Sequence, residues 1–276
     1  MKAIKWSRNQ EKIIHTYVGA YDTLRKEADL SPDNKIINRV LSELVSVISK
    51  PLDQHLATEI LIHDEIQSIR GNMLAKLNIA ETLMEEHYAK SYAGKITNLE
   101  DFHTFLYWEN YKELIQTEMK ELRKVKDEIR SFAFVGTGPL PLSPLLLQQE
   151  LGANMTCLDI DEQAYSLGKR IIKQLEGEAT SDYVLKDGAF HDYGEFDLVW
   201  IASLVPNKAQ ILERIFQTKP EAIVAIRSVD GIHQLLYEPV DATKFRNVKC
   251  EEVARTKADS FIINSTIFYT FKQLHQ

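Results

Sequence analysis

The residues with the clearest chemical potential lie in a glycine turn in the second half of the chain. The segment 134–142 reads FVGTGPLPL, a short apolar run followed by two glycines and then by the start of a helical pattern. Gly136 and Gly138 allow the backbone to approach a ligand closely, and the free N–H groups at the start of a helix bind a carboxylate. The sequence therefore predicts that this turn binds an anionic part of a cofactor.

Acidic residues follow the next two apolar runs, as in a nucleotide site. Asp159 ends the run that begins at 154, about twenty residues after the turn, where a carboxylate accepts hydrogen bonds from a ribose diol. Asp161 is a weaker competitor for that role, and the alternative for Asp159 is to cap the next helix. Asp187, followed by Gly188 and Ala189, comes after a third run and is placed to reach the amino group of adenine.

The glycine pattern narrows the choice of cofactor. Residues 139–142 stand where a dinucleotide fingerprint has its third glycine, and the Gly-Lys-Ser/Thr of a P-loop is absent. S-adenosylmethionine (SAM), with its methionine carboxylate near the helix start, fits better. We predict SAM as co-substrate, bound by Gly136, Thr137, Gly138, Pro139, Asp159, Asp161, Asp187 and Ala189.

The elements that must position these residues change character near residue 128. Before it, apolar residues recur at three- and four-residue spacing, which predicts helices. The longest apolar stripe consists of Ile69, Met73, Leu77, Ala80 and Met84. After it, short apolar runs alternate with helical segments, and this order predicts a mostly parallel sheet with right-handed crossovers.

The predicted strands and the helices between them can be given as ranges. The strands are 131–136, 154–160, 183–186, 197–202 and 222–227, with β-rich stretches at 248–254 and 260–271 that suit an antiparallel edge. The helices between them are 141–151, 162–175 and 208–217. We therefore expect an α/β protein with an all-helical domain at 1–128 and a Rossmann-like SAM-binding domain at 129–276.

Composition excludes several other classes of function. A net charge of −7 argues against nucleic-acid binding as the main task. No apolar run approaches the roughly 20 residues that a membrane-spanning helix needs, and the N-terminal segment lacks the core of a signal peptide. The two cysteines are far apart and the eight histidines show no metal-ligand spacing, so no metal is predicted. We expect a cytoplasmic protein.

Five segments resemble the nicotianamine synthase family. The match at 134–143, FVGTGPLPLS, is the most specific. The others are AETLMEEHY at 80–88, FLYWENY at 105–111, RSVDG at 227–231 and LYEPV at 236–240. This family includes plant and archaeal nicotianamine synthases and bacterial relatives that make opine-type metallophores. The resemblance implies that a substrate amine attacks the Cγ of SAM, accepts its 3-amino-3-carboxypropyl (aminobutanoyl) arm and releases 5′-methylthioadenosine.

The resemblance also implies the catalytic residues. Glu85 matches the family's catalytic glutamate and Tyr111 its active-site tyrosine. A carboxylate beside a hydroxyl suits an amine that must lose a proton, whereas without the resemblance Glu85 would be expected on the solvated surface. Glu81, four residues before Glu85, is a second candidate, for holding an ammonium group.

Four other residues are candidates for binding the substrate. Arg227, at the end of the fifth apolar run, has two readings: a bidentate fork for a substrate carboxylate, or a surface salt bridge. Ser203 follows the fourth run, and Tyr237 is expected to line the pocket. Tyr107 is expected either to wall the pocket or to pack in the core.

The acceptor stays open at this level. We expect one transfer onto an amino acid such as histidine, in metallophore biosynthesis, with an iterative nicotianamine synthase that condenses three SAM molecules as the alternative. A SAM-dependent methyltransferase would share the sheet but release S-adenosylhomocysteine, and a non-catalytic interaction module would not bind SAM. We expect a small-molecule substrate and no nucleic-acid or membrane partner, and the sequence leaves a homodimer open.

Overall fold

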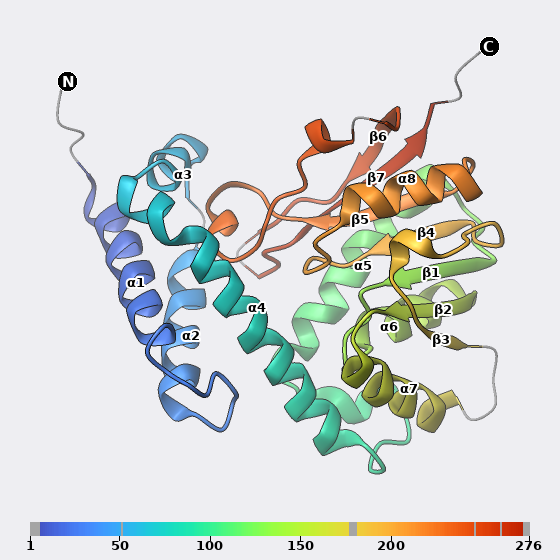
Figure 1. Cartoon of the computed structure of the whole chain (residues 1–276), viewed down its shortest axis with the longest axis horizontal. Coiled ribbons are helices and arrows are strands. Elements are labelled where there is room, and N and C mark those ends of the chain that lie inside the picture. The colour runs from blue at the N-terminus through green and yellow to red at the C-terminus, as the bar shows by residue number, and fades with distance from the viewer. Residues whose placement is uncertain (1–5, 51, 177–180, 246, 260, 273–276) are drawn as a thin grey trace. The chain divides into compact units, whose positions relative to one another are not determined.

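A computed structural model describes residues 6–50, 52–176, 181–245, 247–259 and 261–272 (Figure 1). The chain divides into two compact units. The helical unit consists of Met1–Met84, Val229–Pro239 and Ala258–Ile263. The sheet unit consists of Glu85–Ser228, Val240–Lys257 and Asn264–Gln276.

This division differs from the predicted boundary at 128. Helix α5 (Trp108–Val125) belongs to the sheet unit, because it packs on α6 and β6. The periodicity of α5 predicts a helix but does not say which element it packs against. Two late segments, which the sequence assigned to the Rossmann-like domain, belong instead to the helical unit.

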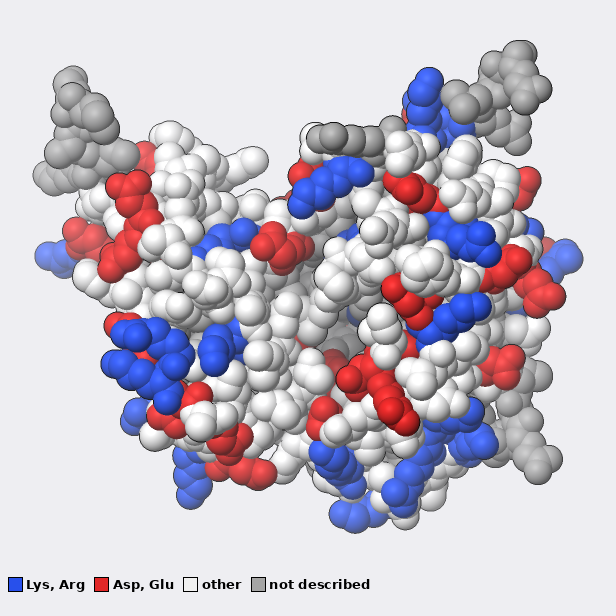
Figure 2. Space-filling model, viewed as in Figure 1, with Lys and Arg blue, Asp and Glu red and all other residues white. Residues whose placement is uncertain are grey.

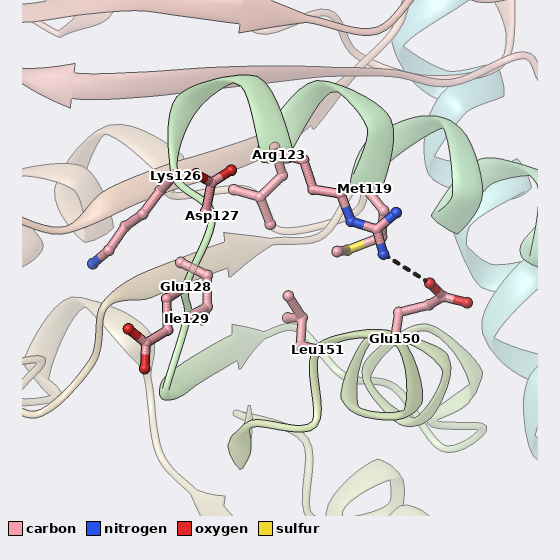
Figure 3. A pocket seen from close by; sticks show the side chains of 9 residues that line it. Met119, Arg123, Lys126, Asp127, Glu128, Ile129, Glu150 and Leu151 are labelled. Carbon is pink, nitrogen blue, oxygen red and sulfur yellow. Dashed lines mark hydrogen bonds and ion pairs between the residues drawn. The ribbon is translucent and has the colours of Figure 1, made fainter.

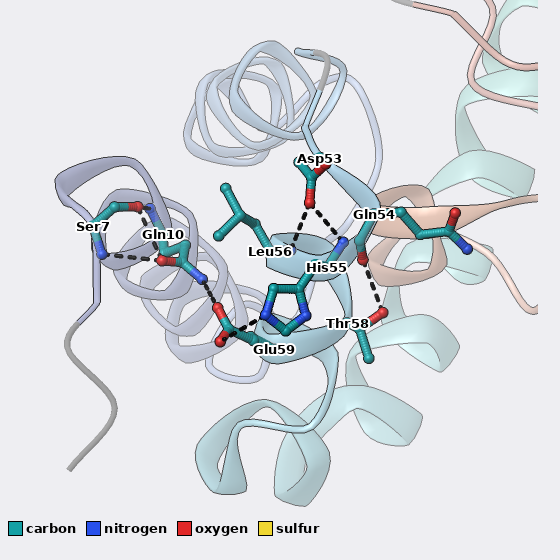
Figure 4. Close-up of polar contacts among 8 residues, drawn as sticks. All are labelled: Ser7, Gln10, Asp53, Gln54, His55, Leu56, Thr58 and Glu59. Carbon is teal, nitrogen blue, oxygen red and sulfur yellow. Dashed lines mark hydrogen bonds and ion pairs between the residues drawn. The ribbon is translucent and has the colours of Figure 1, made fainter. Parts of the chain in front are cut away.

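In the described part of the helical unit, four helices and a short 3-10 helix are present. They are α1 (Arg8–Leu24), α2 (Lys35–Ile48), α3 (Gln54–Leu61), the part of α4 (Asp64–Tyr92) that ends at Met84, and η3 (Gly231–Leu235). Ser7 and Gln10 form a capping box at the start of α1, and Asp53 caps α3. Figure 4 shows how Gln10 then reaches across to α3, where its Nε2 donates to Glu59 Oε2 over 2.8 Å.

The core of the helical unit includes the predicted apolar stripe. Met73 and Ala80 of α4 are buried, and Ile69 and Leu77 pack against the same cluster. Leu235 joins this core from the late segment. That segment is also held by Arg70, whose Nε donates to the Gln234 carbonyl over 2.8 Å. The late segment therefore completes the helical unit.

Over the residues that the structure describes, the sheet has seven strands in the order β3-β2-β1-β4-β5-β7-β6. The first five are parallel: β1 (Ser131–Val135), β2 (Asn154–Asp159), β3 (Asp182–Leu185), β4 (Leu198–Ile201) and β5 (Ile223–Ser228). The last two strands are β6 (Cys250–Arg255) and β7 (Ser265–Phe271). Strand β7 runs antiparallel to both of its neighbours, β5 and β6. The predicted Rossmann-like α/β architecture with an antiparallel edge is confirmed. Since the strand order reverses at β1, a ligand is expected at the carboxyl ends of β1 and its neighbours.

Helices cover both faces of this sheet. Helix α8 (Lys208–Thr218) packs Ile211, Leu212 and Ile215 on the face that includes Val199 and Val224. Side chains alternate between the two faces of a strand, so Phe134, Trp200 and Arg227 lie on the opposite face. Helices α5 and α6 (Leu142–Leu151) lie on that face, where they contact Arg227. Helix α7 (Glu162–Glu176) follows β2 and contacts β3. The described residues of this unit also form three 3-10 turns: η1 (Leu99–Thr104), η2 (Gly188–Phe190) and η4 (Ala242–Lys244).

The surface carries mixed charge. On the face drawn in Figure 2, acidic and basic side chains are interspersed and form no extended area of one sign. A nucleic-acid-binding face would instead collect lysines and arginines on one patch or stripe. Among the described residues, no helix has the length and apolar character to cross a membrane.

Candidate active site

The glycine turn has the backbone geometry that only glycine adopts readily. Gly136 has φ +79° and Gly138 has φ +72°. The N–H groups of Gly136 and Thr137 both donate to the Leu158 carbonyl of β2, at 2.9 and 3.2 Å. A Cβ on Gly136 would lie 2.3 Å from Val205 Cγ2. The turn is therefore held against the ends of β2 and the β4–α8 loop.

Three side chains, those of Asp159, Tyr183 and Glu85, meet at Gly138. Its N–H donates to Asp159 Oδ2 over 2.7 Å, and its carbonyl accepts from the Tyr183 hydroxyl over 2.9 Å. A Cβ added to Gly138 would lie 2.6 Å from Glu85 Oε2. The predicted catalytic glutamate and the predicted ribose-binding aspartate therefore both contact the turn that we expect to bind the cofactor.

The two acidic residues at the end of β2 have separate tasks. Asp161 Oδ1 accepts from the Ala164 N–H over 2.7 Å, at the start of α7, so Asp161 and not Asp159 caps that helix. Asp159 is buried, and its Oδ1 accepts from the Asp161 N–H over 3.0 Å. Burial raises the pKa of Asp159, while the N–H donors of Asp161 and Gly138 oppose that rise. Each carboxylate oxygen has a second lone pair for a ligand hydroxyl.

The loop after β3 is built around Asp187. Its Oδ1 accepts from the Ala189 N–H over 2.9 Å and from Asn207 Nδ2 over 3.1 Å. Asp187 thereby begins η2 and ties that turn to the start of α8. Its position at the carboxyl end of β3 is the predicted one.

Sequence reasoning missed two apolar residues beside these aspartates. Ile160 follows Asp159 and is 70% exposed, and Phe190 follows Ala189 and is 71% exposed. Large apolar side chains left exposed next to polar binding groups are typical of ligand sites. Ile160 could have been noticed because it is an apolar residue directly after the aspartate that ends β2, but in the sequence it looks like one more residue of the strand.

The Glu85 carboxylate has a hydroxyl partner. Tyr111 of α5 donates to Glu85 Oε1 over 3.3 Å. Phe105 packs edge-on against both Tyr107 and Tyr111, with ring centroids 5.8 and 5.9 Å apart. Tyr107 therefore belongs to an aromatic cluster that borders the Glu85–Tyr111 pair, and its place in the wall of a substrate pocket stays a prediction.

Glu81 pairs with Tyr237 within the helical unit. The Tyr237 hydroxyl donates to Glu81 Oε2 over 2.8 Å. Burial raises the pKa of Glu81 to about 7, and the hydrogen bond from Tyr237 opposes this rise. A carboxyl group with a pKa near neutrality can both hold and release a proton at working pH.

Arg227 requires a correction. It was predicted as a fork for a substrate carboxylate or as a surface salt bridge, but it is buried and its Nε and Nη2 donate to the Glu118 carboxylate at 3.0 and 3.1 Å. Its Nη1 donates to Ser143 Oγ over 2.7 Å. The surface salt bridge is therefore wrong: Arg227 is buried and joins α5 and α6, and its contact with a substrate carboxylate stays a prediction.

Ser203 lies at the carboxyl end of β4 as predicted. Its Oγ accepts from Asn264 Nδ2 over 2.9 Å, and its carbonyl accepts from Lys208 Nζ over 2.7 Å. These contacts hold the β4–α8 loop, which also contains the Val205 that contacts Gly136.

One pocket lies apart from these residues. It is lined by the end of α5 and the end of α6, where Arg123 pairs with Glu150 at 3.4 Å (Figure 3). Ile129 and Leu151, which line this pocket, come just before β1 and β2. The pocket therefore lies at the amino-terminal edge of the sheet, away from the glycine turn. Within the ranges that the structure describes, no group of three or more histidines, cysteines or acids is arranged to hold a metal.

The fold and the site are those of a Rossmann-like nucleotide-binding protein, with a glycine turn and aspartates at the strand ends. The family model described as "Nicotianamine synthase protein" matches residues 6–275. The chain belongs to the nicotianamine synthase family. Its members transfer the 3-amino-3-carboxypropyl group of SAM and not the methyl group, so this chain is an enzyme of that class and the methyltransferase and non-catalytic readings are set aside.

Individual relatives agree with this assignment. A nicotianamine synthase of Solanum lycopersicum is 26% identical over 274 residues, which cover 94% of this chain and 83% of the relative. Nicotianamine synthase 3 of Oryza sativa subsp. indica is 27% identical over 93% of this chain and 78% of its own length. Among solved structures, MtNAS in complex with MTA and tNA superposes with a TM-score of 0.83 at 19% identity, over 98% of this chain and 100% of that one. A mutant of MtNAS in complex with S-adenosylmethionine also has a TM-score of 0.83.

Proposed function

We propose that the enzyme attaches one 3-amino-3-carboxypropyl group from SAM to the amine of an amino acid, with histidine as the first candidate. The observation that carries this proposal is the position of the Glu85 carboxylate against Gly138, with Tyr111 hydrogen-bonded to it. A carboxylate at the cofactor turn is a suitable acceptor for the proton of an attacking amine.

The proposed reaction is a single displacement. The amine nitrogen of the acceptor attacks the Cγ of SAM and forms the N–C bond. The S–Cγ bond breaks, its electron pair stays on sulfur, and neutral 5′-methylthioadenosine leaves. The proton that the nitrogen loses passes to Glu85, and Tyr111 orients the carboxylate through its hydroxyl.

The same residues suggest how SAM lies. Its methionine carboxylate would lie against the turn, near the start of α6. Its ribose would bond Asp159, and its adenine would lie near Asp187 and Ala189, against the exposed apolar side chains of Ile160 and Phe190. This placement directs the aminocarboxypropyl arm toward the part of the turn that Glu85 contacts. Ser203 and Tyr107 border this region from the β4–α8 loop and the aromatic cluster.

A second role for a carboxyl group falls to Glu81. Its pKa of about 7 and its hydrogen bond from Tyr237 suit a group that exchanges a proton with a substrate ammonium near neutral pH. We propose that Glu81 and Tyr237 help to bind the acceptor.

An iterative nicotianamine synthase is the second candidate. The names of the curated relatives favour it, because those relatives match more than nine-tenths of this chain. The difference between the two candidates depends on whether the first product binds again as an acceptor. A role in metallophore biosynthesis and a cytoplasmic location remain our predictions, and a homodimer stays open.

Mass spectrometry of a reaction that contains the enzyme, SAM and a mixed amino-acid pool tests the proposal. We expect 5′-methylthioadenosine together with one amino acid that has gained a single aminobutanoate unit. Nicotianamine as the product would establish the iterative reaction instead. Release of S-adenosylhomocysteine without 5′-methylthioadenosine would contradict both candidates.

A further inference from the structure

The peptide between Gly138 and Pro139 can be held in only one way. Proline has no N–H, so a hydrogen bond can hold this peptide only at the Gly138 carbonyl oxygen. The preceding peptide is held at the Gly138 N–H, which donates to Asp159 Oδ2 over 2.7 Å. The orientation of the turn at Pro139 therefore depends on the donor to that carbonyl.

Tyr183 is this donor. Its hydroxyl donates to the Gly138 carbonyl over 2.9 Å from a buried position on β3, and its ring packs edge-on against Tyr165 at 5.3 Å. A rigid, buried phenol places its hydroxyl accurately, because the aromatic side chain has few rotatable bonds. Burial raises the pKa of the Tyr183 hydroxyl well above its ordinary value, so it stays a donor at working pH.

Gly168 of α7 provides the space for this contact. A Cβ at Gly168 would lie 2.5 Å from Tyr183 Cε1 and 3.0 Å from the Gly138 carbonyl oxygen. Glycine in the interior of a helix is unfavourable relative to alanine. The close approach of α7 to Tyr183 and to the turn explains why glycine occupies this helical position.

We propose that Tyr183 is a positioning residue for SAM: through the Gly138 carbonyl it fixes the turn that receives the aminocarboxypropyl end, and Gly168 makes this contact possible. The inference rests on the placement of SAM proposed above. Tyr183 acts through the backbone of Gly138 and not as a ligand of SAM.

A second tyrosine offers an internal comparison. Tyr193 is buried, and its hydroxyl donates to the Gly188 carbonyl over 2.9 Å, in the loop on the adenine side. The Gly188 carbonyl also accepts from the His191 N–H at 3.3 Å. Loss of the Tyr193 hydroxyl therefore leaves that loop with a remaining hydrogen bond.

The test compares two ligands by calorimetry. SAM carries the aminocarboxypropyl arm and 5′-methylthioadenosine lacks it. In Tyr183→Phe we expect the affinity for SAM to fall roughly tenfold, the effect of one lost hydrogen bond, and the affinity for 5′-methylthioadenosine to fall by less than about threefold. In Tyr193→Phe we expect the ratio of the two affinities to stay at its wild-type value. Tyr92→Phe, which loses a hydroxyl contact to Thr104 outside the cofactor loops, is the control for both ligands.

Gly168→Ala provides a second variant that keeps the tyrosine. Its added Cβ should displace Tyr183 or the turn and weaken SAM binding in the same ligand-selective way. Gly71→Ala in α4 is the matched control, because a Cβ there meets nothing within 4 Å. We expect that control to bind SAM as the wild type does.

Amide hydrogen exchange in the unliganded protein separates this inference from the proposed placement of SAM. Faster exchange at Gly136, Thr137 and Gly138 in Tyr183→Phe supports the positioning role. Wild-type exchange at these amides together with a wild-type ratio of ligand affinities would overturn it. If the wild-type enzyme bound 5′-methylthioadenosine as tightly as SAM, the placement of the aminocarboxypropyl arm at the turn would be wrong, whatever the exchange rates.

Discussion

Gly138 and Glu85 are so close that a methyl group on Gly138 would lie 2.6 Å from Glu85 Oε2. Real Cβ atoms do not approach an oxygen so closely, so one of the two residues would have to move. The contact joins the proposed catalytic carboxylate to the glycine turn that we expect to bind SAM, although 53 residues separate them in the chain. Substitution at Gly138 is therefore expected to affect chemistry as well as cofactor binding.

We expect Gly138→Ala to lose both SAM affinity and turnover. The φ of +72° costs about 1–2 kcal/mol for a residue with a Cβ, and the added methyl group displaces Glu85. The double variant Gly138→Ala, Glu85→Ala removes the clash but not the backbone strain, so it should recover part of the SAM affinity and no turnover. Calorimetry and 5′-methylthioadenosine release measure the two effects. Equal SAM affinity in the single and double variants would show that the steric clash between the added methyl group and Glu85 does not weaken SAM binding.

Glu85→Gln tests the proton acceptor itself. Glutamine keeps the size of the side chain and can still accept from Tyr111, but it cannot take a proton from the amine. We expect SAM affinity within about twofold of the wild type and turnover lower by about 10²–10⁴, the usual contribution of a general base. The matched control is Glu86→Gln on the same helix, since Glu86 pairs with Lys90 at 2.9 Å. Full turnover in Glu85→Gln would remove this residue from the mechanism.

The raised pKa of Glu81 predicts a dependence of stability on pH. The folded protein holds the proton up to a pKa of about 7, whereas the unfolded chain releases it near 4.5. Between these values the folded state binds more protons, so the free energy of unfolding decreases as the pH rises from about 4.5 to 7. The expected loss is about 3 kcal/mol, since each pKa unit corresponds to about 1.4 kcal/mol.

Urea unfolding at pH 5 and pH 8 measures this effect. The wild type should lose more stability between the two pH values than Glu81→Gln, whose side chain does not ionise. In Tyr237→Phe the loss should be larger still, because the carboxylate has lost its hydroxyl donor. The same pH dependence in the wild type and in Glu81→Gln would show that Glu81 titrates normally.

The elements and the turn could be predicted from the sequence because their signals are local. Apolar runs, helical periodicity and the two glycines of the turn depend only on neighbouring residues. The partners of the buried polar groups could not be predicted, because the fold brings them together over long separations. Tyr183 is 45 residues from the Gly138 carbonyl that it holds, and Glu118 is 109 residues from Arg227. Ile160 was missed for a related reason: its exposure is a property of the folded sheet edge.

Arg227 and Glu118 form a buried ion pair, and unfolding experiments can measure how much this pair stabilises the fold. Removing one partner from a buried ion pair leaves an uncompensated charge, so Arg227→Met should destabilise the fold by about 3–5 kcal/mol. In Arg227→Met with Glu118→Leu both charges are absent, and most of the stability should return. Denaturant unfolding of the three variants, including Glu118→Leu alone, gives the coupling between the two residues.

The KM for the acceptor distinguishes this structural role from the substrate role that the sequence suggested. Arg227→Lys keeps the positive charge but loses the bidentate geometry toward Glu118, so it should unfold more easily than the wild type. Because Arg227 Nε, Nη1 and Nη2 all donate within the protein, the KM for the acceptor should stay within about twofold in the folded fraction of that variant. If Arg227→Lys had the stability of the wild type and a higher KM for the acceptor but not for SAM, Arg227 would instead bind the substrate carboxylate.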